Sequence, residues 1–276
     1  MARLIIEPGR TERQYWSDLW RYRELFYVLA WRDISVRYKQ TAIGVLWALI
    51  QPLVTMIILT VIFSKLAKMP SQGVPYPLLV FAGLLPWQFF ASSLTGASQS
   101  LVSNSNLISK VYFPRLVIPA SAVVTALVDF LITFFLLIAT MAWYRFCPPW
   151  QMVLLPLFIG LAFLAALGPG LLLTALNVKF RDFRYIIPFI VQFGVYVSPV
   201  GFSSSVTAQW LTGQWRLAYA LNPMVGVIDG FRWCLLGGAN RIDPDGFMLS
   251  LAVTAFLLVL GIWYFRKTER TFADVI

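Results

Sequence analysis

The chain has 276 residues, of which 59% are hydrophobic, 16% aromatic and only 12% charged, and its formal net charge is +10. A soluble domain averages about 25% charged and 45–50% apolar residues, so this composition excludes an ordinary soluble enzyme and a disordered tail. Histidine is absent and cysteine occurs only twice, which excludes imidazole catalysis, a His/Cys metal centre and a disulfide framework. We therefore expect an all-α membrane protein whose basic residues face anionic lipid or partner subunits, not nucleic acid.

Residues 1–41 are predicted to form a cytoplasmic tail, because they contain many charged residues and no apolar signal-peptide core. Within the tail, the stretch Thr11–Ala30 repeats apolar residues at three- and four-residue spacing. This spacing predicts an amphipathic helix in the inner membrane interface. The alternative is a cytoplasmic helix packed on the protein's own loops.

A basic run, Arg32–Thr41, follows this helix and leads into the first apolar stretch. One interpretation is an anchor that keeps the N-terminus inside. The other is a basic mouth of a transport path, where Arg37 and Lys39 would meet phosphate groups. The spacing of the residues is compatible with both.

The rest of the chain, residues 42–276, is predicted to be a transmembrane domain. A bilayer core of about 30 Å requires about 20 apolar helical residues. Six stretches approach this length, at about 42–63, 76–101, 116–143, 152–176, 185–202 and 247–265. The sequence thus predicts six transmembrane helices. The fifth is short and has a proline near each end, Pro188 and Pro199.

The region 203–240 is apolar on average but contains Asp229 and Arg232. A charge near the centre of a membrane helix costs about 2.5 kcal/mol or more. We therefore expect an outer re-entrant helical pair here, not a span. With the N-terminus inside, 16 of the 22 Lys and Arg residues lie on the inner side. The positive-inside rule then places both termini in the cytoplasm of a multi-pass inner-membrane protein.

Asp129 lies near the middle of the third predicted span, and acidic residues at such depth are functional by default. A proton relay would make the chain a proton-coupled carrier, but no other acid lies in a span. The simpler interpretation is a hydrogen bond to Thr125 or Thr133, one turn away.

The loop 103–115 is predicted to contain a short inner helix that Pro114 ends. Its apolar side chains are Leu107, Ile108, Val111 and Phe113. An apolar face on a cytoplasmic loop indicates docking onto a partner protein. Packing onto the ends of the spans explains the face equally well.

In the fifth predicted span, Phe189, Phe193 and Tyr196 share one helical face. Such a stripe usually packs in a core. It would also suit a path for sugars, whose C–H faces stack on aromatic rings.

The sequence contains no phosphate-binding loop of the G-x-x-x-x-G-K-[ST] type, no paired carboxylates and no nucleophile elbow. These absences predict a chain that is not an enzyme and binds no cofactor itself. A basic inner face, a docking loop and no site for ATP indicate a transport subunit powered by a separate protein.

Five motifs in order resemble the permease subunits of polysaccharide ABC exporters, which serve O-antigen (lipopolysaccharide), capsule and teichoic acid export. The motifs begin at Arg32-Asp33-Ile34, Phe81-Ala-Gly-Leu-Leu-Pro86, Asn106-Leu-Ile-Ser-Lys110, Asn177 with Arg181-Asp182, and Leu221-Asn222-Pro223. The likeness extends from Arg32 to the C-terminus. It implies a homodimer bound to two ATP-binding subunits that carry ATP and Mg²⁺, and a polyprenyl-pyrophosphate-linked polysaccharide that passes outward between the two copies.

The resemblance also implies roles for individual residues. The expected substrate path is lined by Tyr38, Trp47, Phe189, Phe193 and Tyr196, with Arg37 and Lys39 at the inner mouth for the lipid pyrophosphate. The expected ATPase-coupling residues are Leu107, Ile108, Lys110, Val111, Phe113 and Pro114. The outer gate is expected around Asn222 and Pro223. The alternatives are an ABC exporter of a drug or small lipid, a proton-coupled carrier using Asp129, and a membrane enzyme acting on lipid-linked sugar.

Overall fold

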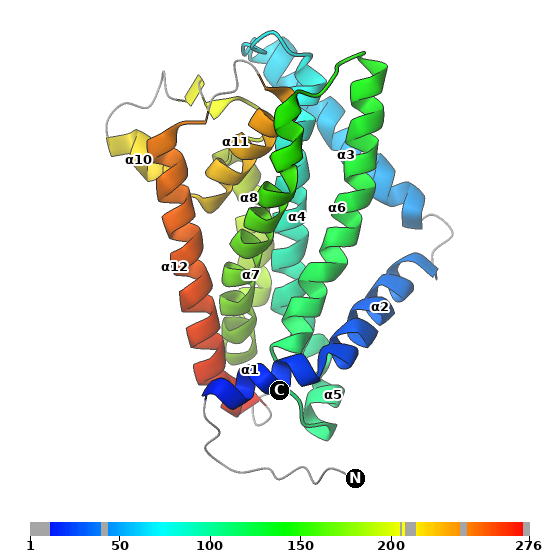
Figure 1. Ribbon diagram of the computed structural model, residues 1–276, viewed down its shortest axis with the longest axis vertical. Coiled ribbons are helices and arrows are strands. Elements are labelled where there is room, and N and C mark those ends of the chain that lie inside the picture. Colours follow the sequence, from blue (N-terminus) through cyan, green and yellow to red (C-terminus); the bar gives the residue numbers. More distant parts are fainter. Residues whose placement is uncertain (1–11, 40–43, 205, 208–213, 238–241, 273–276) are drawn as a thin grey trace.

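The computed structural model describes residues 12–39, 44–204, 206–207, 214–237 and 242–272, and every element in this part of the chain is helical. The long helices form an upright bundle (Figure 1). The predicted boundary at residues 41 and 42 lies outside the described residues, as do residues 1–11 of the tail and residues 205, 208–213 and 238–240 of the predicted re-entrant region. The all-α membrane fold is thus confirmed.

The centre of the bundle is α4 (Tyr76–Ser103), which contacts α3 (Gly44–Thr60), α6 (Val117–Trp143), α7 (Leu155–Lys179), α8 (Phe183–Val197) and α11 (Pro223–Leu236). In its apolar window 78% of the residues are buried, against 17% for the span that contains α3. A helix that is apolar on all sides is expected to lie inside a bundle, whereas its neighbours expose one side to lipid.

Five described helices are long and apolar enough to cross a membrane. They are Leu46–Leu66 (α3 with the π-helical η1, Val61–Leu66), Tyr76–Ser103, Val117–Trp143, Trp150–Lys179 (η2, Trp150–Leu154, with α7) and Pro244–Thr271 (α12, Pro244–Thr268, with η3, Glu269–Thr271). These agree with five of the six predicted spans to within a few residues.

The fifth predicted span, 185–202, differs. Its helix α8 has 15 residues, which covers about 22 Å at 1.5 Å per residue, less than the bilayer core. Six full crossings are therefore not confirmed. The chain turns after α8, and Ser198, Pro199 and Val200 are buried.

The packing of α12 on α7 depends on a close backbone crossing. A Cβ atom on Gly261 would lie 2.1 Å from the carbonyl oxygen of Gly168, and one on Gly168 would lie 2.7 Å from the backbone of Leu258. Only glycine permits this approach, so the two helices form a fixed pair.

The predicted re-entrant pair corresponds to α10 (Gln214–Ala220) and α11, at the end of the bundle opposite α1 (Glu12–Arg21) (Figure 1). Arg232 of α11 is 1% exposed. It donates hydrogen bonds to the carbonyl oxygens of Leu79 (3.1 Å), Val200 (2.8 Å) and Phe202 (2.6 Å). The charge that argues against a span thus holds the turn after α8 against α4.

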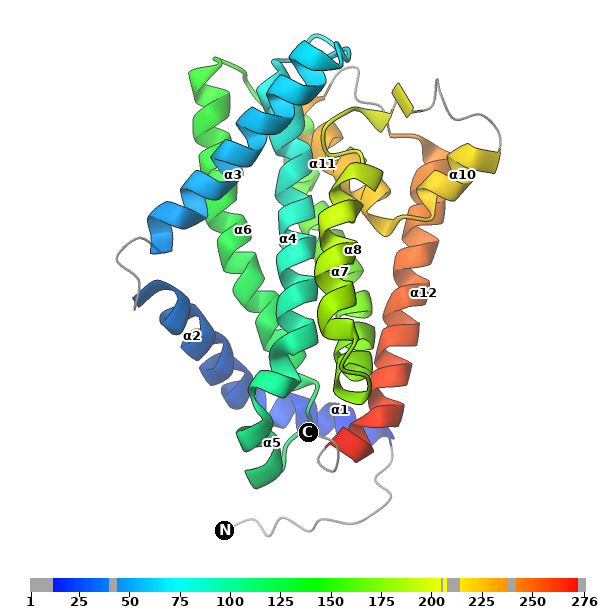
Figure 2. The same cartoon turned by 180° about the vertical axis from the view of Figure 1, so that it is seen from behind.

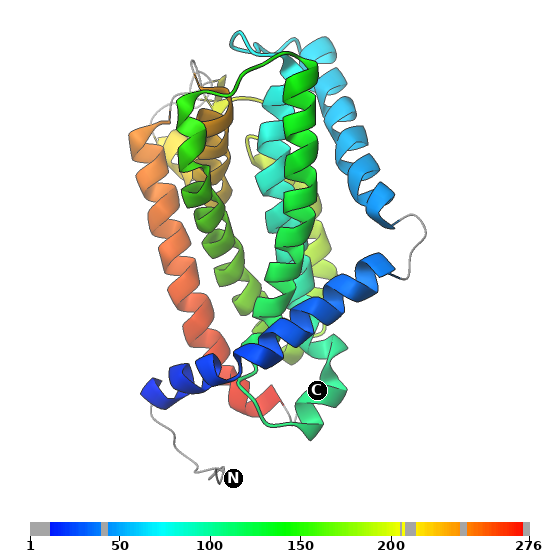
Figure 3. The ribbon, with the colours of Figure 1, turned by 45° about the vertical axis from the view of Figure 1, so that its right-hand side comes forward.

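At the other end, α1 and α2 (Arg23–Lys39) cross the bundle, and α2 then rises obliquely along α6 (Figure 3). Tyr15, Leu19 and Phe26 pack against an apolar cluster of the protein itself. Trp16 and Trp20 on the same segment are exposed. The segment therefore combines both predicted features, a packed face and an exposed aromatic face.

Candidate functional site

A cavity of about 970 Å³ lies among α2, α3, α4, α6 and α8. Its lining includes Arg37, Tyr38, Trp47, Gln51, Trp87, Gln88, Phe89, Ser92, Thr95, Gln99, Asp129, Phe130, Thr133 and Val191. The position of the cavity follows from the fold, because α2 and α3 stand away from the core on the side of α4 where α6 and α8 pack (Figure 2).

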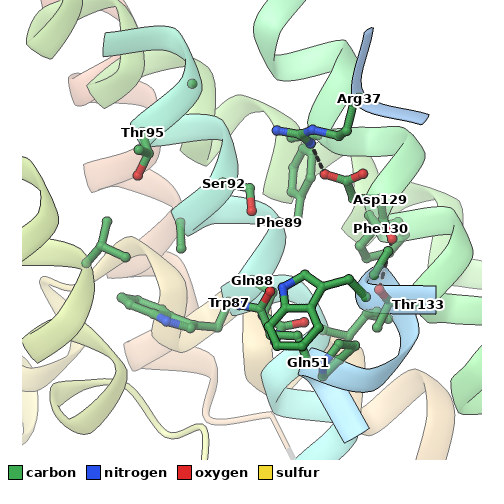
Figure 4. Close-up of a pocket in the computed structure, with 18 of the residues that line it drawn as sticks. Arg37, Gln51, Trp87, Gln88, Phe89, Ser92, Thr95, Asp129, Phe130 and Thr133 are labelled. Atoms are coloured by element: carbon green, nitrogen blue, oxygen red, sulfur yellow. Dashed lines mark hydrogen bonds and ion pairs between the residues drawn. The ribbon is translucent and has the colours of Figure 1, made fainter. Parts of the chain in front are cut away.

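The lining of the cavity mixes aromatic rings with amides and hydroxyls. Trp47 of α3 is an exposed ring in the lining, Trp87, Phe89 and Phe130 line it as largely buried rings, and Gln88 and Ser92 add hydrogen-bonding groups (Figure 4). Rings that stack on C–H faces, together with amides and hydroxyls that bond hydroxyl groups, are the combination that suits sugars. The central α4 thus contributes more of this surface than the sequence predicted.

An ion pair lies in the wall of the cavity. The guanidinium of Arg37 and the hydroxyl of Tyr38 both donate to the carboxylate of Asp129, beside Phe89 and Phe130 (Figure 4). Thr133 donates instead to the backbone carbonyl of Asp129 (2.9 Å) and Thr125 to that of Ser121 (3.0 Å). The predicted partners of the Asp129 carboxylate were therefore wrong, since its donors come from α2.

Of the predicted path residues, the structure places Tyr38 and Trp47 at the cavity, and Arg37 with them. Lys39 is exposed at the end of α2 and is not among the described lining residues.

The predicted aromatic stripe of α8 faces away from the core. Phe189, Phe193 and Tyr196 are each half or more exposed, and the rings of Phe189 and Phe193 lie 4.3 Å apart. Helix α8, which carries the stripe, packs on α4 and α7 (Figure 2). Core packing within one chain therefore does not explain it, and a single chain does not bring it into the cavity, where α8 contributes Val191.

The predicted coupling loop forms α5 (Ser105–Lys110), which projects beyond the end of the bundle that carries α1 (Figure 1). Ile108, Phe113 and Pro114 are buried, and Leu107 packs against the same cluster. Lys110 and Val111, together with Tyr112, are exposed. The packing alternative thus applies to one side of the loop, and docking of a partner on the exposed residues stays a prediction.

Polar contacts fix the end of the coupling loop to the end of the chain. The backbone N–H of Arg115 donates to the carboxylate of Glu269 (2.7 Å), and the guanidinium of Arg115 donates to the carbonyl oxygen of the same residue. Tyr15 of α1 lies under the guanidinium of Arg266, 4.6 Å from ring to cation. Burial, and then the negative charge of Glu269, raise the pKa of Tyr15 above its ordinary value. The end of the loop is therefore bonded to η3, and α1 packs beside it.

The predicted outer-gate residues form a helix start. Asn222 is the N-cap of α11 and accepts from the backbone N–H of Met224 (3.0 Å), while Pro223 occupies the first helical turn. The amide of Asn222 also donates to Ser198 (2.8 Å), the residue that ends α8. These residues thus join α11 to α8. Among the described residues, no group of three or more His, Cys, Asp or Glu is placed to hold a metal ion.

Comparison with known proteins places these features in a family. A family model described as "ABC-2 type transporter" matches residues 24–236. The chain is 30% identical, over 94% of its length and 98% of the relative, to "O-antigen export system permease protein RfbA" of Myxococcus xanthus. It is 29% identical to a protein of the same description from Klebsiella pneumoniae, over 92% and 95% of the two chains. It is 24% identical to "Polysialic acid transport protein KpsM" of Escherichia coli, over 87% and 91%.

Proposed function

The chain belongs to the ABC-2 type transporter family, and on that premise we propose that it is the permease subunit of an ATP-driven exporter of lipid-linked polysaccharide. The observation that carries the proposal is the similarity along nearly the whole chain to permeases named for O-antigen export and for polysialic acid transport. Both of those cargoes are polysaccharides. The cavity supports this cargo class, because its wall alternates aromatic rings with amides and hydroxyls.

The polysaccharide would pass between two copies of the chain. Support comes from two sets of exposed aromatic side chains, Trp47 on α3 and the α8 stripe of Phe189, Phe193 and Tyr196. A second copy facing this surface would enclose it together with the cavity. Many weak stacking contacts of similar strength let a polymer slide, whereas a single strong site would hold it.

Energy would come from ATP and Mg²⁺ bound to two separate ATPase subunits. The exposed surface formed by Lys110, the last residue of α5, and by Val111 and Tyr112 after it is where such a subunit would push. The buried residues Ile108, Phe113 and Pro114 would transmit the push to the span ends, because they pack in the inner cluster. Closure of the ATPase pair would then change the gap between the two permeases.

The inner side of the membrane would be the end that carries α1, α5 and η3. This orientation agrees with the charge distribution, in which most Lys and Arg lie toward that end. Arg37 and Lys39 would meet the pyrophosphate of the lipid carrier near the inner mouth. The junction of Asn222 and Pro223 with the end of α8 would act as the outer gate.

Deletion of the reading frame in its native host tests this function. We expect finished lipid-linked glycan to accumulate on the cytoplasmic side, where a membrane-impermeant glycan-labelling enzyme reaches it only after permeabilisation. Expression of the full chain should restore surface glycan, and a chain expressed without its ATPase should not. Normal surface glycan in the deletion strain, with export of a drug or small lipid lost instead, would contradict the proposed cargo.

A further inference from the structure

Helix α2 is attached to the bundle in two different ways along its length. Its buried residues, Leu29 and Ala30, lie near its middle. Three side chains in the second half of α2 make polar contacts with the bundle. Arg32 donates to the amide oxygen of Asn104 (2.9 Å), next to α5. Arg37 and Tyr38 donate to Asp129 on α6. The last turns of α2 are therefore held by contacts that another polar group is able to replace.

The contact at Asp129 is open to the cavity. The side chains of Arg37 and Asp129 are 49% and 26% exposed, and both line the cavity with Tyr38. An arginine and an aspartate in contact have no net charge, so an anion that approaches this wall meets no unpaired cation. Asp129 also satisfies Arg37 at a depth where an unpaired charge is costly.

The chemistry of this contact is that of a phosphate site filled by a carboxylate. Guanidinium and phenol groups are both good donors to phosphate oxygens, and charge-assisted bonds strengthen with the charge of the acceptor. A diphosphate carries more negative charge and more acceptor oxygens than one carboxylate. It is therefore able to take both donors from Asp129, whereas the single phosphodiester charge of a bulk phospholipid is a weaker competitor.

We propose that Asp129 is an internal counter-ion that occupies Arg37 and Tyr38 in the unloaded permease, and that the diphosphate of a lipid-linked cargo displaces it on entry. This inference rests on the proposed function and deepens it by assigning the basis of headgroup selection. Exchange keeps Arg37 paired at every stage, and it rejects singly charged phospholipids. It also changes the polar contacts between α2 and α6, the helix that begins just after the coupling loop.

The test is a binding measurement on the purified full-length chain in zwitterionic nanodiscs, with radiolabelled farnesyl diphosphate as the probe. Asp129→Asn keeps the size and removes the charge. If the contact is closed about 90% of the time in the wild type, its removal raises the apparent affinity about tenfold. The apparent affinity of Asp129→Asn for inorganic pyrophosphate should rise by a similar factor, because the exchange involves only the diphosphate headgroup. Phosphatidylglycerol should compete with the probe in the variant but hardly in the wild type.

Two further variants make the result specific. Arg37→Gln should weaken probe binding, and the gain from Asp129→Asn should be smaller in that background, because Arg37 is one of the two donors that Asp129 occupies. Asp182→Asn is the matched control, since it removes an exposed negative charge outside the described cavity lining. It should leave the affinity unchanged.

The proposal is overturned if folded Asp129→Asn binds the probe no more tightly than the wild type. It is also overturned if the gain is undiminished without Arg37, if pyrophosphate shows no gain, or if Asp182→Asn gives the same gain. Should Asp129→Asn not fold, Asp129→Ser provides a second neutral variant, because a serine hydroxyl bonds the carbonyl four residues earlier, as Thr133 does. No gain in a permease that still exports glycan removes this inference alone, whereas a wild type without ATP-driven export removes the proposed function.

Discussion

Two arginines show how differently two regions of this bundle are built. Arg232 is 1% exposed and bonds three backbone carbonyl oxygens between α11, α4 and the turn after α8. Arg37 is half exposed at a cavity and bonds one carboxylate on α6. Arg232 is enclosed by protein, whereas the carboxylate that Arg37 bonds lies beside a cavity, where another anion is able to reach its donors. The first region is thus a fixed scaffold, and the second is where cargo and motion belong.

The largest expected effect is the loss of the fixed arginine. Arg232→Met removes the donor that the carbonyl oxygens of Val200 and Phe202 share, and it removes a positive charge that acts on Asp229. We expect a stability loss of about 3 kcal/mol or more, measured as thermal unfolding of the purified chain in detergent. Arg216→Gln, which breaks the exposed pair with Asp243, should cost less than about 1 kcal/mol. Equal losses would end the distinction between fixed and exchangeable arginines.

The coupling loop allows exposed and buried residues at neighbouring positions to be compared. Val111→Asp with Tyr112→Asp changes exposed residues, so we expect lost copurification of the ATPase at an unchanged melting temperature. Phe113→Asp places a charge in the inner apolar cluster, so the melting temperature should fall as well. Retained ATPase binding by the Val111 and Tyr112 variant would show that the exposed residues just after α5 are not the docking surface.

The smallest effect is expected on the exposed aromatic face. Phe193→Ala should slow export of long glycans several-fold and change stability by less than about 0.5 kcal/mol, because the ring is half exposed and packs mainly on Phe189. The matched control is Phe135→Ala, an exposed phenylalanine on α6. Pulse-chase measurement of the export of glycans of defined length gives the rate for both variants. If both variants slow export equally, the α8 stripe has no special role.

The sequence predicted the elements of this fold well and their contacts less well. Apolar length located five spans, because a membrane helix needs an uninterrupted apolar run that local sequence displays. Local spacing predicts Thr125 or Thr133 as the hydrogen-bond partner of Asp129. The donors to the Asp129 carboxylate instead lie more than 90 residues away in the chain. Pairings of that separation are set by the packing of α2 on α6 and are invisible to periodicity.

Two further differences have a similar origin. A helical period shows that Phe189 and Phe193 share a face, but not whether that face is inside or outside. Asp229 and Arg232 were read as obstacles to membrane insertion, although a charged residue in an apolar stretch also signals a buried polar network. The roles of the predicted coupling, path and gate residues remain predictions until the variants are made.

The most direct test of the central claim is glycan transport in reconstituted vesicles. We propose that the chain is a conduit driven by a separate ATPase, so it should move lipid-linked glycan into the vesicle lumen only when that partner and ATP with Mg²⁺ are both supplied. Protection of the glycan from an external glycosidase is the readout. ATP-dependent protection with the partner, and none with the chain alone, is the predicted result. Protection by the chain alone, without nucleotide, would contradict it.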